Sequence, residues 1–252
     1  MKRFISLCLA LVIVISAAAV TVTAEMSGDW VYLVENGEAI IQRCYMRNVG
    51  EIEVPAQLGV HSVTGILADA FYDCSYAVKV TLTAGIRTIE AGAFSHMQSL
   101  ASIDVDSGNP YFLSENGILF NKQKTAVIAY PPKKQGSSYA LPSNVTEIKD
   151  YAFLGCEYLE SITLPQGLTA IGYNAFGDSG LKIVTIPGSV ETIGDYAFEW
   201  CADLSEVVIE TGVKYIGISA FVQCYNLESV SIPSTVVKMG RGHSTVHRGL
   251  EN

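Results

Sequence analysis

One unit of the chain, residues 190–209, reads VETIGDYAFEWCADLSEVVI and contains every element of a repeat that organises the sequence. Its apolar positions are Val190 and Ile193, the pair Ala197-Phe198, and the segment Leu-x-x-Val-x-Ile that ends the unit. The phenylalanines of equivalent Ala-Phe pairs are Phe71, Phe94, Phe153, Phe176, Phe198 and Phe221, at spacings of 23, 59, 23, 22 and 23 residues. The long gap corresponds to two units plus an insertion. A fixed period of this length predicts a solenoid, in which successive units stack.

The end of each unit predicts a short strand, because Leu-x-x-Val-x-Ile alternates apolar and polar residues. Proline often follows and ends the ladder. Eight such segments are expected in one parallel sheet: 49–54, 77–82, 100–105, 136–142, 159–164, 181–186, 204–209 and 227–232. On the far side, the Ala-Phe segments should form short helices or turns, and the preceding Ile-Gly pairs should allow tight turns through a positive φ at glycine.

Stacking should place each repeat phenylalanine on its neighbours inside the coil. A unit of about 23 residues does not bury its apolar side alone, so the units need one another. Truncation of one ring, as in Phe176→Ala, should therefore cost about 3–5 kcal/mol.

The unit resembles the BspA-like leucine-rich repeats of surface and secreted proteins from gut and oral bacteria and some parasitic protists. The residues that carry the resemblance are Ile193-Gly194, Ala197-Phe198, Cys201, Leu204, Val207 and Ile209, and it covers residues 49–240. The segment from Asn109-Pro110-Tyr111-Phe112 to Tyr130-Pro131 is similar to an insertion common in that family. The resemblance implies an adhesive or protein-binding module.

Two hairpins are expected beside the repeats, each with an Asn-Gly turn, which is a strong hairpin signal. The first, within residues 25–48, should cap the first coil; the second, within about 106–135, should project from the solenoid. Residues 241–252 form a polar tail. The last unit starts at Val236 without an Ala-Phe pair, which leaves three interpretations: a frayed final turn, a shortened chain, or an edge covered by a partner.

Residues 1–24 read as a signal peptide: Lys2 and Arg3, then an apolar run, then small residues up to Ala24. A membrane anchor is the alternative. Removal of this segment would change the net charge from −9 to −11, and no further run of spanning length follows. We therefore expect a protein that is released or held non-covalently at the cell surface. We expect no nucleic-acid partner, because so acidic a chain repels phosphate backbones.

Catalytic, cofactor and metal sites are not expected, and we predict that the protein is not an enzyme. The sequence has no GxSxG, no CxxC and no glycine-rich phosphate loop. His243 and His247 could bind a metal on a helix, but the neighbouring glycines disfavour one. An exported chain with several cysteines suggests disulfides. We favour buried free thiols, because cysteines recur three residues after the repeat phenylalanine at Cys74, Cys156, Cys201 and Cys224.

Two surfaces are candidates for binding. The outward positions of the C-terminal strands are Glu160, Ser161, Thr163, Lys182, Thr185, Ser205, Glu206, Glu228, Ser229 and Ser231. The inserted hairpin offers Tyr111, Phe112, Phe120, Lys122, Lys124 and Tyr130. The strand face could instead be a solvated scaffold, and the hairpin aromatics could pack the hairpin on the coil.

We therefore predict a secreted or cell-surface module that binds an extracellular or surface protein. The alternatives are a structural spacer that displays other parts, and a carbohydrate-binding protein, which clustered exposed aromatics would favour.

Overall fold

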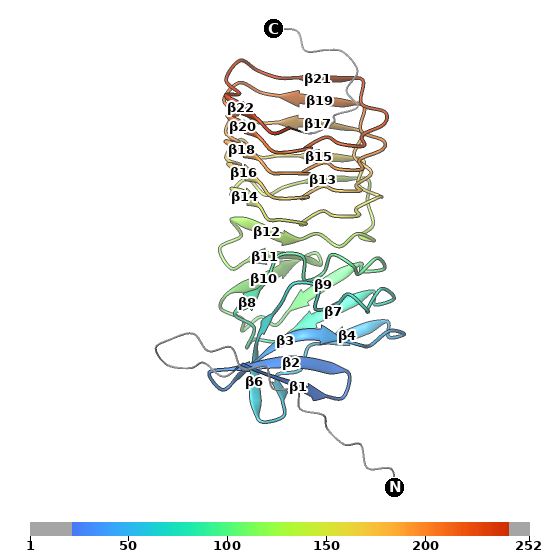
Figure 1. The fold of residues 1–252 in the computed structure, drawn as a ribbon, viewed down its shortest axis with the longest axis vertical. Helices are drawn as coiled ribbons and strands as arrows, with labels where there is room; N and C mark the ends of the chain where they lie inside the picture. The colour runs from blue at the N-terminus through green and yellow to red at the C-terminus, as the bar shows by residue number, and fades with distance from the viewer. Residues whose placement is uncertain (1–21, 242–252) are drawn as a thin grey trace.

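The protein is an elongated β-solenoid whose coils stack along one axis, seen in a computed structural model that describes residues 22–241 (Figure 1). The described residues form strands and turns and no helix, so the expected solenoid is confirmed but its short helices are not. The Ala-Phe segments are six-residue turns: 68–73, 91–96, 150–155, 173–178, 195–200 and 218–223. In each turn the residue two before the phenylalanine has a positive φ, as at Tyr196 (57°) and Asn174 (46°), and a left-handed residue ends right-handed helical geometry.

All eight predicted strands are present, but they form two parallel sheets and not one. The first sheet contains β4 (Glu51–Glu53), β7 (Lys79–Leu82) and β9 (Ser102–Val105). The second contains β13 (Ser138–Ala140), β15 (Ser161–Thr163), β17 (Ile183–Ile186), β19 (Glu206–Ile209) and β21 (Ser229–Ser231). The inserted hairpin lies between β9 and β13 in the chain and separates the two sheets.

A third parallel ladder runs along another side of the coils and was not predicted. It continues an eight-stranded sheet through β12 (Ala126–Ala129), β14 (Glu147–Ile148), β16 (Ala170–Ile171), β18 (Thr192–Ile193), β20 (Tyr215–Ile216) and β22 (Lys238–Met239). Its two-residue strands carry the Ile of each Ile-Gly pair inward.

The glycines that follow those isoleucines do not have the positive φ expected of them. They lie where adjacent coils approach closely. A Cβ on Gly194 would come within 2.5 Å of the carbonyl carbon of Gly172. Glycine is required here for backbone stacking rather than for turn geometry.

The inserted hairpin is part of the stack and does not project, which corrects the prediction. Strands β10 (Phe112–Glu115) and β11 (Ile118–Asn121) pair antiparallel, and β11 pairs with β12. Side chains of β11 alternate between two apolar cores: Ile118 and Phe120 face the C-terminal coils, whereas Leu119 faces the N-terminal coils. A strand buried on both faces has few polar residues. The hairpin therefore lies between the two apolar cores and contributes side chains to both.

Asn109 anchors the start of the hairpin. Its buried side chain donates from Nδ2 to the carbonyls of Thr83 (3.0 Å) and Ile86 (2.9 Å) in the preceding coil. Its Oδ1 accepts from the backbone N–H groups of Tyr111 and Phe112, each at 2.8 Å. All of its side-chain polar atoms are satisfied, so a buried amide fixes the hairpin at low cost.

The predicted N-terminal hairpin is confirmed as β2 (Trp30–Glu35) and β3 (Glu38–Cys44), with left-handed Asn36 and Gly37 in the turn. The same six-stranded sheet holds β1 (Thr23–Ser27), β5 (Gln57–Leu58), β6 (His61–Ile66) and β8 (Thr88–Ile89). Strand β1 overlaps the last residues of the predicted signal peptide, whose residues 1–21 lie outside the described chain. Most of the predicted tail, residues 242–252, also lies outside it.

The repeat aromatics form two stacked columns. Phe71 and Phe94 stack at 5.4 Å between ring centroids. The second column runs from Tyr130 through Phe153, Phe176 and Phe198 to Phe221, with centroids 4.9–5.3 Å apart. Tyr130 therefore occupies the phenylalanine position of the degenerate unit. These columns confirm the expected stacking.

Candidate functional site

The outer surface of β13, β15, β17, β19 and β21, here called the sheet face, presents side chains in straight rows. Parallel pairing aligns Ser138, Ser161, Ile183, Glu206 and Ser229 in one row. A second row contains Ala140 and Thr163, followed by Thr185, Val208 and Ser231. Successive parallel strands lie about 4.8 Å apart, so each row is a regular array.

A third row precedes the strands and consists of Glu160, Lys182, Ser205 and Glu228. Their backbones are joined coil to coil, as in Lys182 N–H to Glu160 O at 3.0 Å and Ser205 N–H to Lys182 O at 2.8 Å. The Lys182 ammonium pairs with Glu160 at 2.8 Å, and the Glu160 carboxylate raises the pKa of Lys182. The structure thus brings all ten sequence-predicted residues of this face together on one exposed surface.

Ile183 was not among the predicted residues of this face, although it is half exposed in the middle of the first row. The register puts Val184 and Ile186 inside, so Ile183 faces solvent beside Thr185. Ile183 lines a shallow depression between β15 and β17 together with Ser161, Thr163 and Gln166. The sheet face is therefore flat, hydroxyl-rich and apolar at its centre.

The candidate residues on the inserted hairpin are mostly inaccessible. Phe112, Phe120 and Tyr130 are buried, which fits the alternative that these aromatics pack the hairpin on the coils. Burial also raises the pKa of Tyr130 to about 12. Tyr111 is half exposed and remains available for contact.

The two hairpin lysines have internal partners. Lys122 donates to the carbonyl of Asn109 at 2.6 Å. Lys124 pairs with Glu115 and lies 5.6 Å from the centroid of the Phe120 ring. The exposed contact surface of this hairpin is therefore small.

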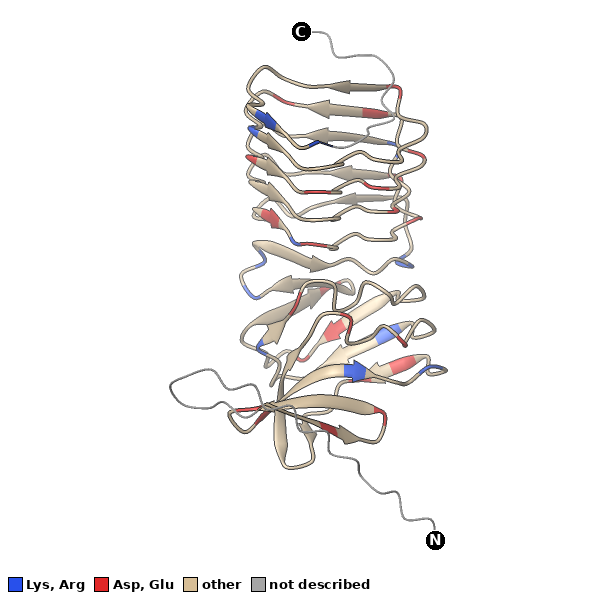
Figure 2. Cartoon of the chain, in the orientation of Figure 1, with Lys and Arg blue, Asp and Glu red and all other residues tan. Residues whose placement is uncertain are grey.

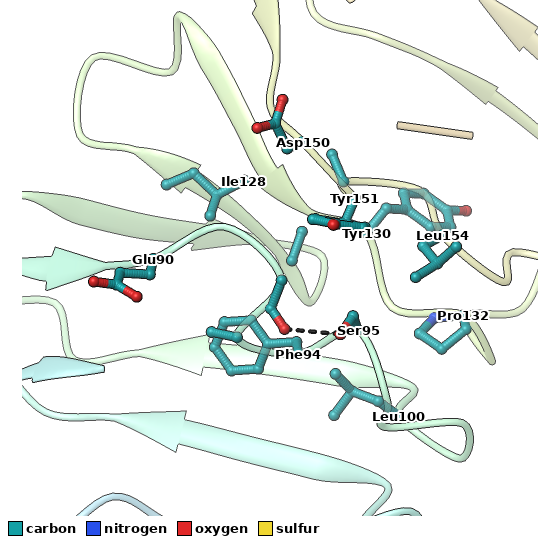
Figure 3. A pocket seen from close by; sticks show the side chains of 14 residues that line it. Glu90, Phe94, Ser95, Leu100, Ile128, Tyr130, Pro132, Asp150, Tyr151 and Leu154 are labelled. Atoms are coloured by element: carbon teal, nitrogen blue, oxygen red, sulfur yellow. Dashed lines mark hydrogen bonds between the residues drawn. The ribbon is translucent and has the colours of Figure 1, made fainter. Parts of the chain in front are cut away.

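A small cavity lies where the two aromatic columns meet, between Phe94 and Tyr130 (Figure 3). Its volume is about 20 Å³, and Leu100, Ile128 and Leu154 contribute to its walls. That volume holds about one water molecule. We conclude that it is a packing gap at the junction rather than a ligand site.

The five cysteines of the described chain are buried and unpaired, as favoured from the repeat phase. Several thiols donate to a carbonyl of the preceding coil: Cys201 to Phe176 O and Cys224 to Phe198 O, both at 3.0 Å. Burial raises the pKa of Cys156 well above its ordinary value. A buried thiol with a raised pKa is a poor nucleophile, so Cys156 is structural.

Within residues 22–241 no group of three metal-ligating side chains is clustered. His243 and His247 lie outside those residues. The described chain also has no helix long and apolar enough to cross a bilayer.

An exposed aromatic surface lies on the turns and was missed by the sequence analysis. We define the turn face as the outer surface of the six-residue turns and of the three residues that follow each turn. Tyr151, Tyr173 and Tyr196 pack edge to face on successive coils, 5.3 and 5.6 Å apart. Trp200 and Tyr225 follow at 5.9 Å, and they are 47% and 60% exposed. The tyrosine spacings of 22 and 23 residues are visible in the sequence and could have revealed this column.

Comparison with known proteins bears on the fold and the family. The profile described as BspA type leucine rich repeat region matches residues 42–124 and 129–243, with 6 copies. A leucine-rich repeat protein from Eubacterium ventriosum has a similar structure (TM-score 0.61), with 23% identity over 81% of this chain and 68% of that one. The pneumococcal vaccine antigen PcpA is also similar (TM-score 0.56, 24% identity). The match covers 78% of this chain and 63% of the antigen. No curated protein sequence matches the chain.

Proposed function

The chain belongs to the BspA-type leucine-rich-repeat family, and from that premise we propose that it is a secreted or cell-surface module that binds another extracellular protein. It would act as an adhesion or recognition surface without catalysis. Residues 1–24 would direct export, and the released protein would remain free or held non-covalently at the surface. The vaccine-antigen description of its pneumococcal relative fits an exposed protein and supports the same placement here.

The observation that carries the proposal is the sheet face. Hydrogen bonds between parallel strands fix the spacing of its rows, and a continuous buried core supports the inner side of the sheet. A surface that is rigid before binding loses little conformational entropy when a partner docks. The hydroxyl groups of Ser161, Thr163, Thr185, Ser229 and Ser231 can donate and accept hydrogen bonds, while Ile183 adds an apolar centre.

Retention of surface proteins tests the proposal. Immobilised chain 25–252 would be incubated with biotinylated surface proteins from intact bacterial and epithelial cells, and retained proteins would be quantified by mass spectrometry. The sheet-face variant Ser161→Arg/Ser229→Arg should lose the specifically retained protein, because its long cations cover the first row. The control Val60→Arg/Ser107→Arg adds the same charge at exposed positions elsewhere and should retain it.

If the wild-type chain retains nothing beyond the bead background, the protein is a spacer and the proposal is wrong. Equal retention by both variants would exclude the sheet face as the binding surface.

A further inference from the structure

We propose that the turn face of residues 173–226 binds a lysine- or arginine-rich segment of a partner protein, through the rings of Trp200 and Tyr225 and the carboxylates beside them. Its two rings lie on a turn and just after the next turn, outside the strands of the sheet face. The proposal rests on the proposed function in treating the chain as a binding module, and it adds a second surface and the chemistry of its partner.

The N-terminal part of the chain already contains the interaction that we infer. On the turn after Phe71, the Arg43 guanidinium lies 5.1 Å from the centroid of the Tyr72 ring. The neighbouring Asp73 pairs with Arg47 at 3.0 Å and with Arg43 at 4.0 Å. Ring and carboxylate therefore hold cations together on the turn face.

The next example follows Phe153. The Lys133 ammonium lies 4.9 Å from the centroid of the Tyr158 ring and pairs with Glu157, the residue before that tyrosine. An aromatic ring with an adjacent carboxylate is thus a recurring cation site on these turns. Arginine and lysine are favoured over such rings because the ring face carries a negative electrostatic potential.

The C-terminal turns repeat the ring and the carboxylate without the cation. Trp200 follows Glu199 and precedes Asp203, and Tyr225 lies on the next coil against Trp200. Among the described residues, no lysine or arginine lies over either ring, and neither Glu199 nor Asp203 has an ion-pair partner. The exposed rings are therefore available to a cation from another molecule.

Charge along these coils is strongly one-sided. Residues 150–232 hold eleven acidic and two basic residues, and the two lysines pair with Glu160 and Glu191 (Figure 2). The turn-face segments 173–178, 195–203 and 218–226 contain four acidic residues and no basic one. Partial burial, followed by the charge of Glu157, raises the pKa of Asp178. A basic segment would relieve this repulsion, whereas an anionic polymer would increase it.

Backbone geometry gives an independent reason to assign Trp200 a role in contact. Its φ is 59°, a left-handed conformation that is strained for a bulky residue. The equivalent position holds Gly155 and Asp178 in the two preceding coils, both left-handed as well. Glycine or aspartate therefore satisfies the fold at this position, so the exposed indole is not needed to build the turn.

Two tryptophans give a direct readout of binding. Trp30 is buried in the N-terminal cap at 6% exposure, whereas Trp200 is 47% exposed. Acrylamide quenching therefore reports mainly on Trp200. A peptide of alternating Arg and Ser, labelled for fluorescence anisotropy, should bind and should protect Trp200 from acrylamide. A peptide of alternating Glu and Ser should do neither.

The variant Trp200→Asn/Tyr225→Ser removes both rings and leaves the charge unchanged. Asparagine tolerates the left-handed conformation, and Ser75 occupies the position equivalent to Tyr225, so the variant should fold. We expect affinity for the arginine peptide to fall about tenfold, the loss of two exposed cation–π contacts. The matched control Glu51→Gln/Glu53→Gln removes two charges from the distant N-terminal sheet and should change affinity less than about twofold.

Three results would overturn the inference. The wild-type chain could fail to prefer the arginine peptide over the glutamate peptide. The control could weaken binding as much as the ring variant does, which would indicate diffuse acidity. A neutral glucan oligosaccharide could protect Trp200 when the arginine peptide does not, which would assign the rings to carbohydrate. None of these results bears on the sheet-face variant, so the two proposals fail separately.

Discussion

Replacement of Gly194 by alanine tests whether coil spacing is set by glycine at the third ladder. An added Cβ would lie 2.5 Å from both the carbonyl carbon and the oxygen of Gly172 and 2.8 Å from the amide nitrogen of Tyr173. These are backbone atoms of the preceding coil, so no side chain can rotate away. Because real Cβ contacts stay above 3.0 Å, the two coils must separate locally by at least a few tenths of an ångström.

Separation weakens the ladder bonds at this point, including Gly194 N–H to Ile171 O at 2.8 Å. Overpacking of a tight interior costs about 1–3 kcal/mol, and a weakened hydrogen bond about 1 kcal/mol. Loss of unfolded-state freedom offsets about 0.4–1 kcal/mol of this. We therefore expect Gly194→Ala to reduce the free energy of unfolding by about 2–3 kcal/mol.

Urea titration followed by far-UV circular dichroism would measure the change. The control is Gly50→Ala, because a Cβ at Gly50 meets nothing within 4 Å and its φ is not left-handed. The control should be neutral or slightly stabilising. If Gly194→Ala unfolds at the same urea concentration as the wild type, the close approach of the coils is not what glycine provides.

Further expectations concern the core, the thiols and the titration of tyrosines. Phe176→Ala should cost about 3–5 kcal/mol, because the ring is fully buried between two stacked neighbours. Phe221→Ala should cost less, because this ring stacks on one neighbour only and is 7% exposed. Equal urea midpoints for the two variants would argue against a stabilising column of rings. Chain 25–252 should show no thiol reactive with Ellman's reagent when native and five in denaturant. Fewer than five would reveal disulfides. Burial raises the pKa of Tyr130 and Tyr139 to about 12. In the native protein their phenolate absorbance should therefore develop at a higher pH than that of exposed tyrosines. The raised pKa means that the folded chain holds these protons more tightly than the unfolded chain. Stability should therefore fall between pH 10 and 12, and a urea midpoint independent of pH there would contradict this.

The positions of the strands were predictable because their signal spans several residues. Leu-x-x-Val-x-Ile fixes both the period and the inward face, and all eight segments pair as strands. The third ladder was missed because strands such as Ala170–Ile171 and Thr192–Ile193 are two residues long, too short for alternation to show. Their Ile-Gly pairs were read as turns, and only the spacing between coils explains the glycine.

The hairpin shows that a correct local prediction can miss the tertiary setting. The Asn116-Gly117 turn was predicted, and both residues are left-handed as that turn requires. Burial of β11 on both faces was also indicated, since Ile118-Leu119-Phe120 is a continuous apolar run. These local signals define the hairpin itself but do not indicate whether it lies inside or outside the stack of coils. The buried Asn109 shows how the hairpin is held inside the stack.

The two candidate surfaces were predictable to different extents, because the direction of side chains follows from the sequence pattern in strands but not in turns. Outward positions on the sheet face follow from the same alternation that identifies the strands, so all ten predicted residues lie on one surface. On the turn face, the direction of the side chains depends on left-handed residues such as Tyr151 and Tyr196. Tyrosine rarely adopts a positive φ, so the sequence does not indicate this conformation. Tyr130 was misassigned to the surface because it replaces phenylalanine in the degenerate unit.

In a stack of coils, backbone hydrogen bonds and the buried core hold the fold together, whereas the exposed side chains form the surfaces that can bind a partner. From residue 150 to residue 223, each coil is joined to the next by backbone hydrogen bonds on all three sides, including the turns, where Phe176 N–H donates to Ala197 O at 2.7 Å. Exposed side chains are therefore free to differ from coil to coil without loss of the fold. After Phe71 and after Phe153, a ring and a carboxylate bind Arg43 and Lys133 internally. The same arrangement around Trp200 has no internal cation among the described residues, which is why the C-terminal coils are the part of this solenoid that we expect to bind a basic partner.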